Sequence, residues 1–148
     1  MAYNPVDTKI EDLIVIHPGT YLGLATSGAK ISLKSADVAN IKGGKVAMMT
    51  AANEFGLCNA STAPFGLFFG DGSRPNEVSV VFRGGIYETK NYDTTVSPLS
   101  NYALNAALVS NASGVLTLRS SEALNLIVGY VTKTPTASTE TLGIRLAV

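Results

Sequence analysis

Glycine and proline interrupt this chain so often that its apolar segments stay short. The 148 residues include 14 glycines and 6 prolines, and the apolar runs between them extend over only a few residues. About ten such runs recur at the 8–12-residue spacing that is typical of a β-sandwich or β-barrel. The sequence therefore predicts an all-β fold, a small antiparallel barrel or sandwich in which helix is limited to short turns.

Three segments carry the clearest strand patterns. Residues 77–82 alternate in side-chain character, and Gly84-Gly85 then predicts a tight turn into residues 86–89, so that the two strands form a hairpin. Residues 126–132 form a second strong strand, and residues 142–148 alternate again and end the chain. From this pattern we expect the core to include Val78, Val80, Phe82, Ile127, Val131 and Ile144.

The chain divides into a short arm and one domain. Residues 1–12 are polar, contain a proline and have no helical period, so they predict an extended arm that can reach about 40 Å. The apolar side chains of Tyr3, Val6 and Ile10 would let this arm lie along a neighbouring molecule. The alternative is a frayed terminus. Residues 13–148 have the length of a single domain.

Charge and hydropathy exclude some partners. Eleven Lys and Arg balance eleven Asp and Glu, so the chain lacks the basic character expected of a nucleic-acid-binding domain. No stretch approaches the ~20 apolar residues of a membrane span. Charged residues make up only 15% of the chain, and a net charge near zero promotes association. The composition predicts a subunit of an assembly that contacts neither nucleic acid nor membrane.

The residues that carry chemistry are sparse. The chain has one histidine, His17, beside a proline-glycine turn, and one cysteine, Cys58, in an apolar run with no orienting acid near it. We expect Cys58 to be a packed core thiol and His17 a solvated turn residue. No cluster of His, Cys and carboxylates has metal-ligand spacing. We therefore expect that the protein is not an enzyme and that it has no catalytic residue, no metal site and no cofactor.

Two glycine-rich segments are similar to ligand loops but depart from them. Gly43-Gly44-Lys45 has Ala39 where a phosphate loop needs glycine, and no hydroxyl residue follows its lysine. Gly70-Asp71-Gly72-Ser73 lacks the later acidic ligands of a calcium loop. Residues 30–45 hold four lysines against one aspartate, which predicts either a solvated face or contact with an acidic partner.

Six segments together carry a resemblance to a known family. They are IKGGKVAMM (41–49), PFGLFF (64–69), VSVVFRGGIYET (78–89), YALNAALVSNASGVLTL (102–118), LIVGYVT (126–132) and LGIRLAV (142–148). In this order they resemble the small β-barrel capsid decoration proteins of tailed bacteriophages, also called cement or head-stabilisation proteins. The resemblance implies a structural virion protein, made in the host cytoplasm, that sits on the capsid surface and binds the major capsid protein. It implies no active site.

The resemblance also implies an oligomer, because decoration proteins often sit as trimers at threefold positions of the shell. We therefore expect a homotrimer on the capsid, with a monomer that binds each capsid subunit alone as the rival. The inter-subunit contact would come from the turn at Gly84 and Gly85 or from the polar loop 90–100, which contains Tyr92 and Leu99.

Two other classes of function stay open. One is a phage tail or baseplate subunit, because turn-rich β-domains are common there. The other is a glycan- or ligand-binding β-domain or an enzyme, which the absence of tryptophan disfavours because binding sites usually present aromatic side chains.

Overall fold

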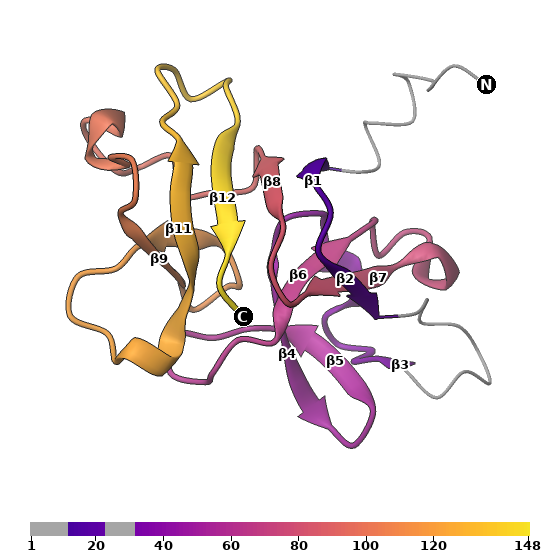
Figure 1. Cartoon of the computed structure of the whole chain (residues 1–148). Coiled ribbons are helices and arrows are strands. Elements are labelled where there is room, and N and C mark those ends of the chain that lie inside the picture. Colours follow the sequence, from indigo (N-terminus) through magenta and orange to yellow (C-terminus); the bar gives the residue numbers. More distant parts are fainter. Residues whose placement is uncertain (1–11, 23–31) are drawn as a thin grey trace, which may run out of the picture.

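The computed structural model describes residues 12–22 and 32–148, and in them the chain folds into two six-stranded sheets (Figure 1). Helix in this part of the chain is limited to single 3-10 turns, at Val38–Asn40, Pro75–Glu77, Leu99–Asn101 and Leu124–Leu126. The prediction of an all-β fold is confirmed. No helix among the described residues is long and apolar enough to cross a membrane.

Sheet A has the strand order β1-β8-β12-β11-β9-β10, and all its neighbours are antiparallel. Its strands are β1 (Leu13–His17), β8 (Ile86–Thr89), β9 (Ala107–Ser110), β10 (Leu116–Leu118), β11 (Ile127–Lys133) and β12 (Leu142–Leu146). Its long central pair, β11 and β12, lies on the left of Figure 1, whereas β8 and β1 approach the other sheet.

Sheet B has the order β2-β7-β6-β4-β5-β3 and is antiparallel except for the pair of β3 and β5. Its strands are β2 (Thr20–Leu22), β3 (Ser32–Leu33), β4 (Val46–Ala51), β5 (Glu54–Leu57), β6 (Gly66–Phe69) and β7 (Ser79–Phe82).

The inner strands of sheet B are buried on both faces. Successive side chains of a strand point to opposite faces, and here they enter two different apolar clusters. The central core contains residues from both sheets, while the second core lies on the other face of sheet B. The pairs that divide in this way are Val46 and Ala47 on β4, Leu67 and Phe68 on β6, and Val81 and Val80 on β7, the first of each pair in the central core. Strands buried on both faces read as continuous apolar runs rather than as alternating ones.

The predicted core is confirmed at five of its six positions. Val78, Val80, Ile127, Val131 and Ile144 are all buried. Phe82, at the end of β7, is only half-buried, so its prediction as a core residue is wrong. Its ring packs at the margin of the second core, 5.2 Å from the ring of Phe65.

The predicted hairpin across Gly84-Gly85 does not form. β7 pairs with β2 and β6 in sheet B, whereas β8 pairs with β1 and β12 in sheet A. Between the two strands Arg83, Gly84 and Gly85 have φ values of 60°, 83° and 96°. Three consecutive residues in the left-handed region turn the chain from one sheet into the other, and glycine is the residue that adopts this region most readily. The segment is therefore a crossover between sheets.

The predicted arm lies almost wholly outside the described residues. Of positions 1–12, only Asp12 is described, so Tyr3, Val6 and Ile10 have no structural account.

Candidate functional site

Cys58 and His17 occupy unrelated places in the fold. Cys58 follows β5 in sheet B and is 1% exposed, and its thiol donates to the backbone oxygens of Asn59 and Thr62 at 3.3 and 3.4 Å. Burial raises the pKa of this thiol, which disfavours the reactive thiolate. His17 is exposed at the end of β1 in sheet A, with Nδ1 3.3 Å from the carbonyl oxygen of Pro18. The two side chains do not form a nucleophile–base pair.

The glycines before Lys45 serve the structure rather than a phosphate group. The N–H of Gly44 donates to the carbonyl of Phe68 at 2.9 Å. The carbonyl of Gly43 accepts from the Thr89 hydroxyl at 3.3 Å and from the Asn91 side-chain amide at 2.7 Å. A side chain on Gly44 would clash with Thr89, so the turn packs directly on the end of β8.

Asp71, the acidic residue of the glycine-rich loop 70–73, is held by neighbouring groups of the chain. One carboxylate oxygen accepts from the N–H of Ser73 at 2.8 Å, and the other pairs with the Lys42 ammonium at 2.9 Å. These hydrogen bonds and the lysine charge lower the pKa of Asp71 against the effect of its burial, which alone would raise it. Among the described residues, no group of three or more His, Cys, Asp and Glu could hold a metal ion.

The loop 90–100 packs against the domain at both ends. Tyr92 is only 4% exposed; its hydroxyl donates to the carbonyl of Glu140 at 2.8 Å, and its ring packs edge-on against Tyr102 at 5.6 Å. Tyr92 therefore belongs to the core, and its prediction as an inter-subunit contact is incompatible with this burial. Leu99 is half-buried against the central core. The polar character of the loop does not reveal either side chain's position.

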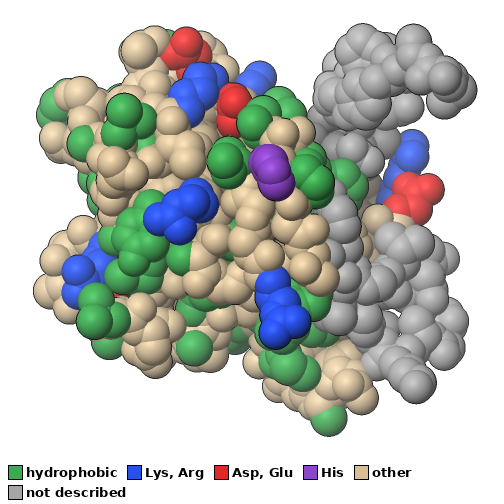
Figure 2. All heavy atoms as spheres, in the orientation of Figure 1, with side chains coloured by type: hydrophobic (Ala, Val, Ile, Leu, Met, Phe, Trp, Pro, Cys, Tyr) green, Lys and Arg blue, Asp and Glu red, His purple; other side chains and the backbone are tan. Residues whose placement is uncertain are grey.

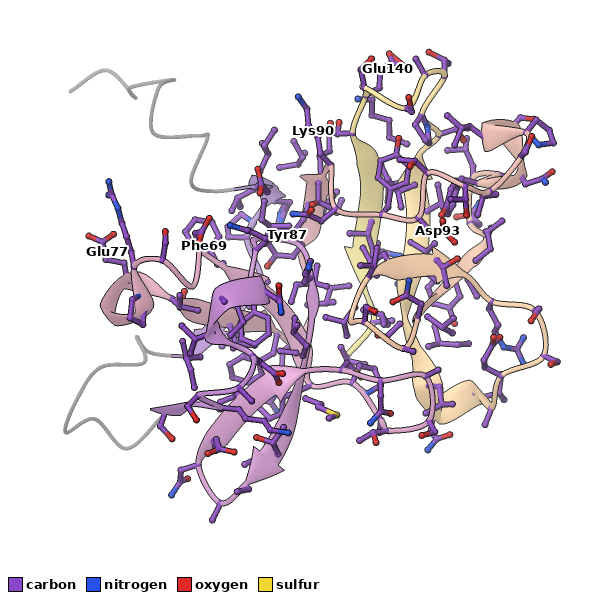
Figure 3. The ribbon with its side chains drawn as sticks, turned by 180° about the vertical axis from the view of Figure 1, so that it is seen from behind. Phe69, Glu77, Tyr87, Lys90, Asp93 and Glu140 are labelled. Atoms are coloured by element: carbon purple, nitrogen blue, oxygen red, sulfur yellow. The ribbon has the colours of Figure 1, made fainter. Side chains whose placement is uncertain are left out.

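Asp93 joins this loop to strand β10 (Figure 3). Its carboxylate accepts hydrogen bonds from the N–H and hydroxyl of Thr95 and from the Thr117 hydroxyl, and its carbonyl accepts from the Tyr102 hydroxyl at 2.7 Å. The Thr95 and Thr117 hydrogen bonds lower the pKa of the Asp93 carboxyl. The loop is a fixed part of the surface.

Among the described strands, β1 is the one that exposes two large apolar side chains. Ile14 and Ile16 are 45% and 54% exposed, and β1 is an edge strand of sheet A. In residues 12–22 and 32–148, no strand pairs with its outer edge. Figure 2 shows hydrophobic side chains on both sides of the histidine, which ends this strand.

The turn at Gly84 adjoins the end of β1. A side chain added at Gly19, two residues after His17, would clash with the Gly84 carbonyl. Nothing lies within 4 Å of the position where a side chain of Gly84 would begin, so this turn faces open space. We call the surface formed by Ile14, Ile16, Pro18 and Gly84 the β1 corner.

A second surface feature is an open pocket of about 400 Å³ at the junction of the two sheets. Asp37 and Asn40 line it from the turn before β4, together with Lys45 and with Leu57 of β5. Ala112 and Ser113 line it from the turn between β9 and β10. That turn is fixed to sheet B, because the carbonyl of Gly114 accepts from the N–H of Val46 at 2.7 Å.

Lys45 is a candidate contact residue whose position in this pocket the sequence did not specify. Of the lysines in the basic segment 30–45, Lys42 pairs with Asp71 and Lys34 is exposed. Lys45 is half-buried, and burial, together with the neighbouring Lys42 charge, lowers its pKa. The excess of lysines in this segment was visible in the sequence, but their pairing depends on the fold.

Comparison of the chain with protein-family models, with curated proteins and with solved structures found no match.

Proposed function

We propose that this protein is a capsid decoration protein, a structural subunit that binds the outside of a phage head and stabilises contacts between major capsid protein subunits. The proposal rests on the order of motifs that resembles this family and on the β1 corner. It assigns the protein no catalytic activity.

The single observation that supports this function best is the exposed apolar edge of β1. Natural proteins usually protect edge strands with lysines, prolines or bulges, because an open edge invites pairing with another chain. β1 has a bulge between Val15 and His17, yet Ile14 and Ile16 remain exposed on it. Such a surface suits a molecule whose working state is bound to a larger assembly.

The rim of the β1 corner is ionic and ordered. Ile14 lies opposite Glu88, whose carboxylate accepts from the Thr141 hydroxyl at 2.6 Å and pairs with Lys133 at 3.1 Å. An apolar centre with a polar rim is the usual anatomy of a protein–protein interface.

We further propose that three copies meet around each threefold position of the shell. The turn at Gly84, which the sequence predicted as a contact, has open space where a side chain would begin and lies against Gly19, three residues after the exposed Ile16. One surface can therefore supply both the contact between copies and the contact with the capsid protein. Cyclic symmetry would let each copy use the same residues.

Binding to empty heads that lack this protein tests the proposal. We expect the purified chain to co-sediment with the heads, and Ile16→Ser to lower its affinity about tenfold by removing apolar contact area. Leu124→Ser is the matched control, because Leu124 is 75% exposed and lies on the 3-10 turn Leu124–Leu126, not on β1. Failure of the unmodified chain to bind would contradict the function, and equal loss in both variants would contradict the role of the β1 corner.

A further inference from the structure

The pocket at the junction of the two sheets is polar and contains a lysine without an ionic partner. Within the described part of the chain, three ion pairs form, and none of them involves Lys45. No hydrogen bond of its ammonium is present there either. Lys42, three residues earlier, has its charge balanced by Asp71.

The acidic group in the pocket is already engaged. One oxygen of Asp37 accepts a hydrogen bond from the N–H of Leu57 at 3.0 Å, and this carboxylate lies beside Gly56 and the stem of Lys34. The charged groups of this region, besides Lys45, are Asp37 in the pocket, Lys34 near it, and Lys42 with its partner Asp71. Three lysines against two aspartates leave this region with one excess positive charge.

Burial makes that charge costly without a partner. Desolvation disfavours the charged ammonium and the adjacent Lys42 repels it, and both effects lower the pKa of Lys45. The negative charge of a carboxylate placed in the pocket would favour the charged ammonium and so oppose both effects. Ser113 and Asn40, which line the same pocket, carry neutral hydrogen-bond donors that an anionic oxygen can also use.

We propose that this pocket binds an aspartate or glutamate side chain from an acidic segment of a partner protein, with the Lys45 ammonium as its ionic partner. The inference rests on the proposed function in one respect: the partner would be the capsid protein. It adds a second, charged contact to the apolar contact of the β1 corner.

A nucleic-acid backbone fits the site less well than a carboxylate does. Phosphate binding requires several cations along a groove, whereas here Lys42 is paired with Asp71, and Lys45 is the only cation among the described residues that line the pocket. The pocket suits one or two anionic oxygens at a time.

Nuclear magnetic resonance titration tests the site without the capsid. The probe is an acetylated, amidated hexaglutamate peptide, with hexaglutamine as the uncharged comparison. We expect saturable shifts of the Asn40, Lys45 and Ser113 amide signals with hexaglutamate only. Lys45→Gln should weaken binding about three- to tenfold, because the pair is half-buried.

Two further variants separate a specific contact from net charge. Lys45→Arg keeps the cation and should retain most of the binding. Arg145→Gln removes the same charge from the outer face of sheet A, where Arg145 stacks on Tyr130, and should leave the affinity unchanged. Equal affinities for the unmodified chain and Lys45→Gln, or no shift at these amides, would overturn the proposal. Tighter binding of a hexathymidine strand at the same amides would overturn the assignment to carboxylate.

Capsid binding then separates this inference from the proposed function. Lys45→Gln should lower affinity for heads while Arg145→Gln retains it. Equal affinity of Lys45→Gln and the unmodified protein for heads would overturn the role of the pocket in capsid binding and leave the proposed function standing. Unmodified protein that binds hexaglutamate but no heads would contradict the decoration function and support the pocket.

Discussion

The Tyr87 hydroxyl accepts a hydrogen bond from the backbone N–H of Gly19 at 3.0 Å. It also donates to the carbonyl of Gly84 at 3.3 Å. Gly19 lies where the chain leaves β1 of sheet A for β2 of sheet B, and Gly84 lies where it returns from β7 to β8. One buried side chain therefore joins the two crossovers at the base of the β1 corner, and Figure 3 shows Tyr87 between the two halves of the molecule.

Tyr87→Phe should lower the free energy of unfolding by about 1–3 kcal/mol, because the Gly19 N–H would lose its partner in a partly buried place. Urea unfolding followed by circular dichroism measures the change. Tyr130→Phe is the matched control, since Tyr130 is half-buried on the outer face of sheet A and its ring packs under Arg145. We expect that control to change stability by less than about 0.5 kcal/mol. Equal effects would contradict the role of the Tyr87 hydroxyl.

Gly84 and Gly85 should differ in their tolerance of alanine. Both have positive φ, so either substitution costs about 1–2 kcal/mol of backbone strain. A side chain on Gly85 would in addition lie 2.5 Å from the Tyr87 hydroxyl and 2.6 Å from the Gly19 nitrogen, whereas Gly84 has open space. We expect Gly85→Ala to lower the melting temperature clearly more than Gly84→Ala. A larger loss of melting temperature for Gly84→Ala than for Gly85→Ala in differential scanning calorimetry would contradict the close packing of Gly85 against Tyr87.

The same crossover explains what the sequence could and could not predict. Strand positions follow from local patterns, so 126–132 and 142–148 were recognisable from side-chain alternation and turn residues. Pairing is not local. A double glycine between two strands is typical of a hairpin. Here Arg83 also adopts the left-handed region, and the chain passes from β7 in sheet B to β8 in sheet A, so the two strands do not pair.

The candidate surfaces show the same limit. The basic segment 30–45 was recognisable as a possible contact with an acidic partner, but only the fold pairs Lys42 with Asp71 and leaves Lys45 in the pocket. Tyr92 stands among polar residues, which predicts exposure, yet its ring packs on Tyr102 and its hydroxyl reaches Glu140 across the chain. A long-range partner of this kind leaves no periodic signal.

The buried tyrosines Tyr92 and Tyr102 should make the protein sensitive to alkali. Burial raises the pKa of Tyr102 and of Tyr92, and nearby carboxylates raise both further. Because the folded-state pKa values exceed the unfolded value of about 10, the stabilisation is fully present below pH 10 and declines as the pH rises above it. Absorbance at 295 nm should show Tyr92 and Tyr102 ionising only together with unfolding. Their ionisation at pH 10 in folded protein would contradict this prediction.

Deletion of residues 2–11 should lower affinity for empty heads without lowering the melting temperature of the free protein. The first described residue, Asp12, must stay, because its carboxylate accepts from the Asn91 side-chain amide at 3.3 Å and its backbone lies against Gly43. The arm is joined through Asp12 to β1, which carries the exposed Ile14 and Ile16. We therefore expect the arm and these isoleucines to contact one continuous surface of the capsid. Sedimentation with heads and a thermal scan are the two measurements. A variant in which Tyr3, Val6 and Ile10 are replaced by serine keeps the length of the arm and should lose affinity to a similar degree. Unchanged affinity in both variants would instead support a frayed terminus that takes no part in binding.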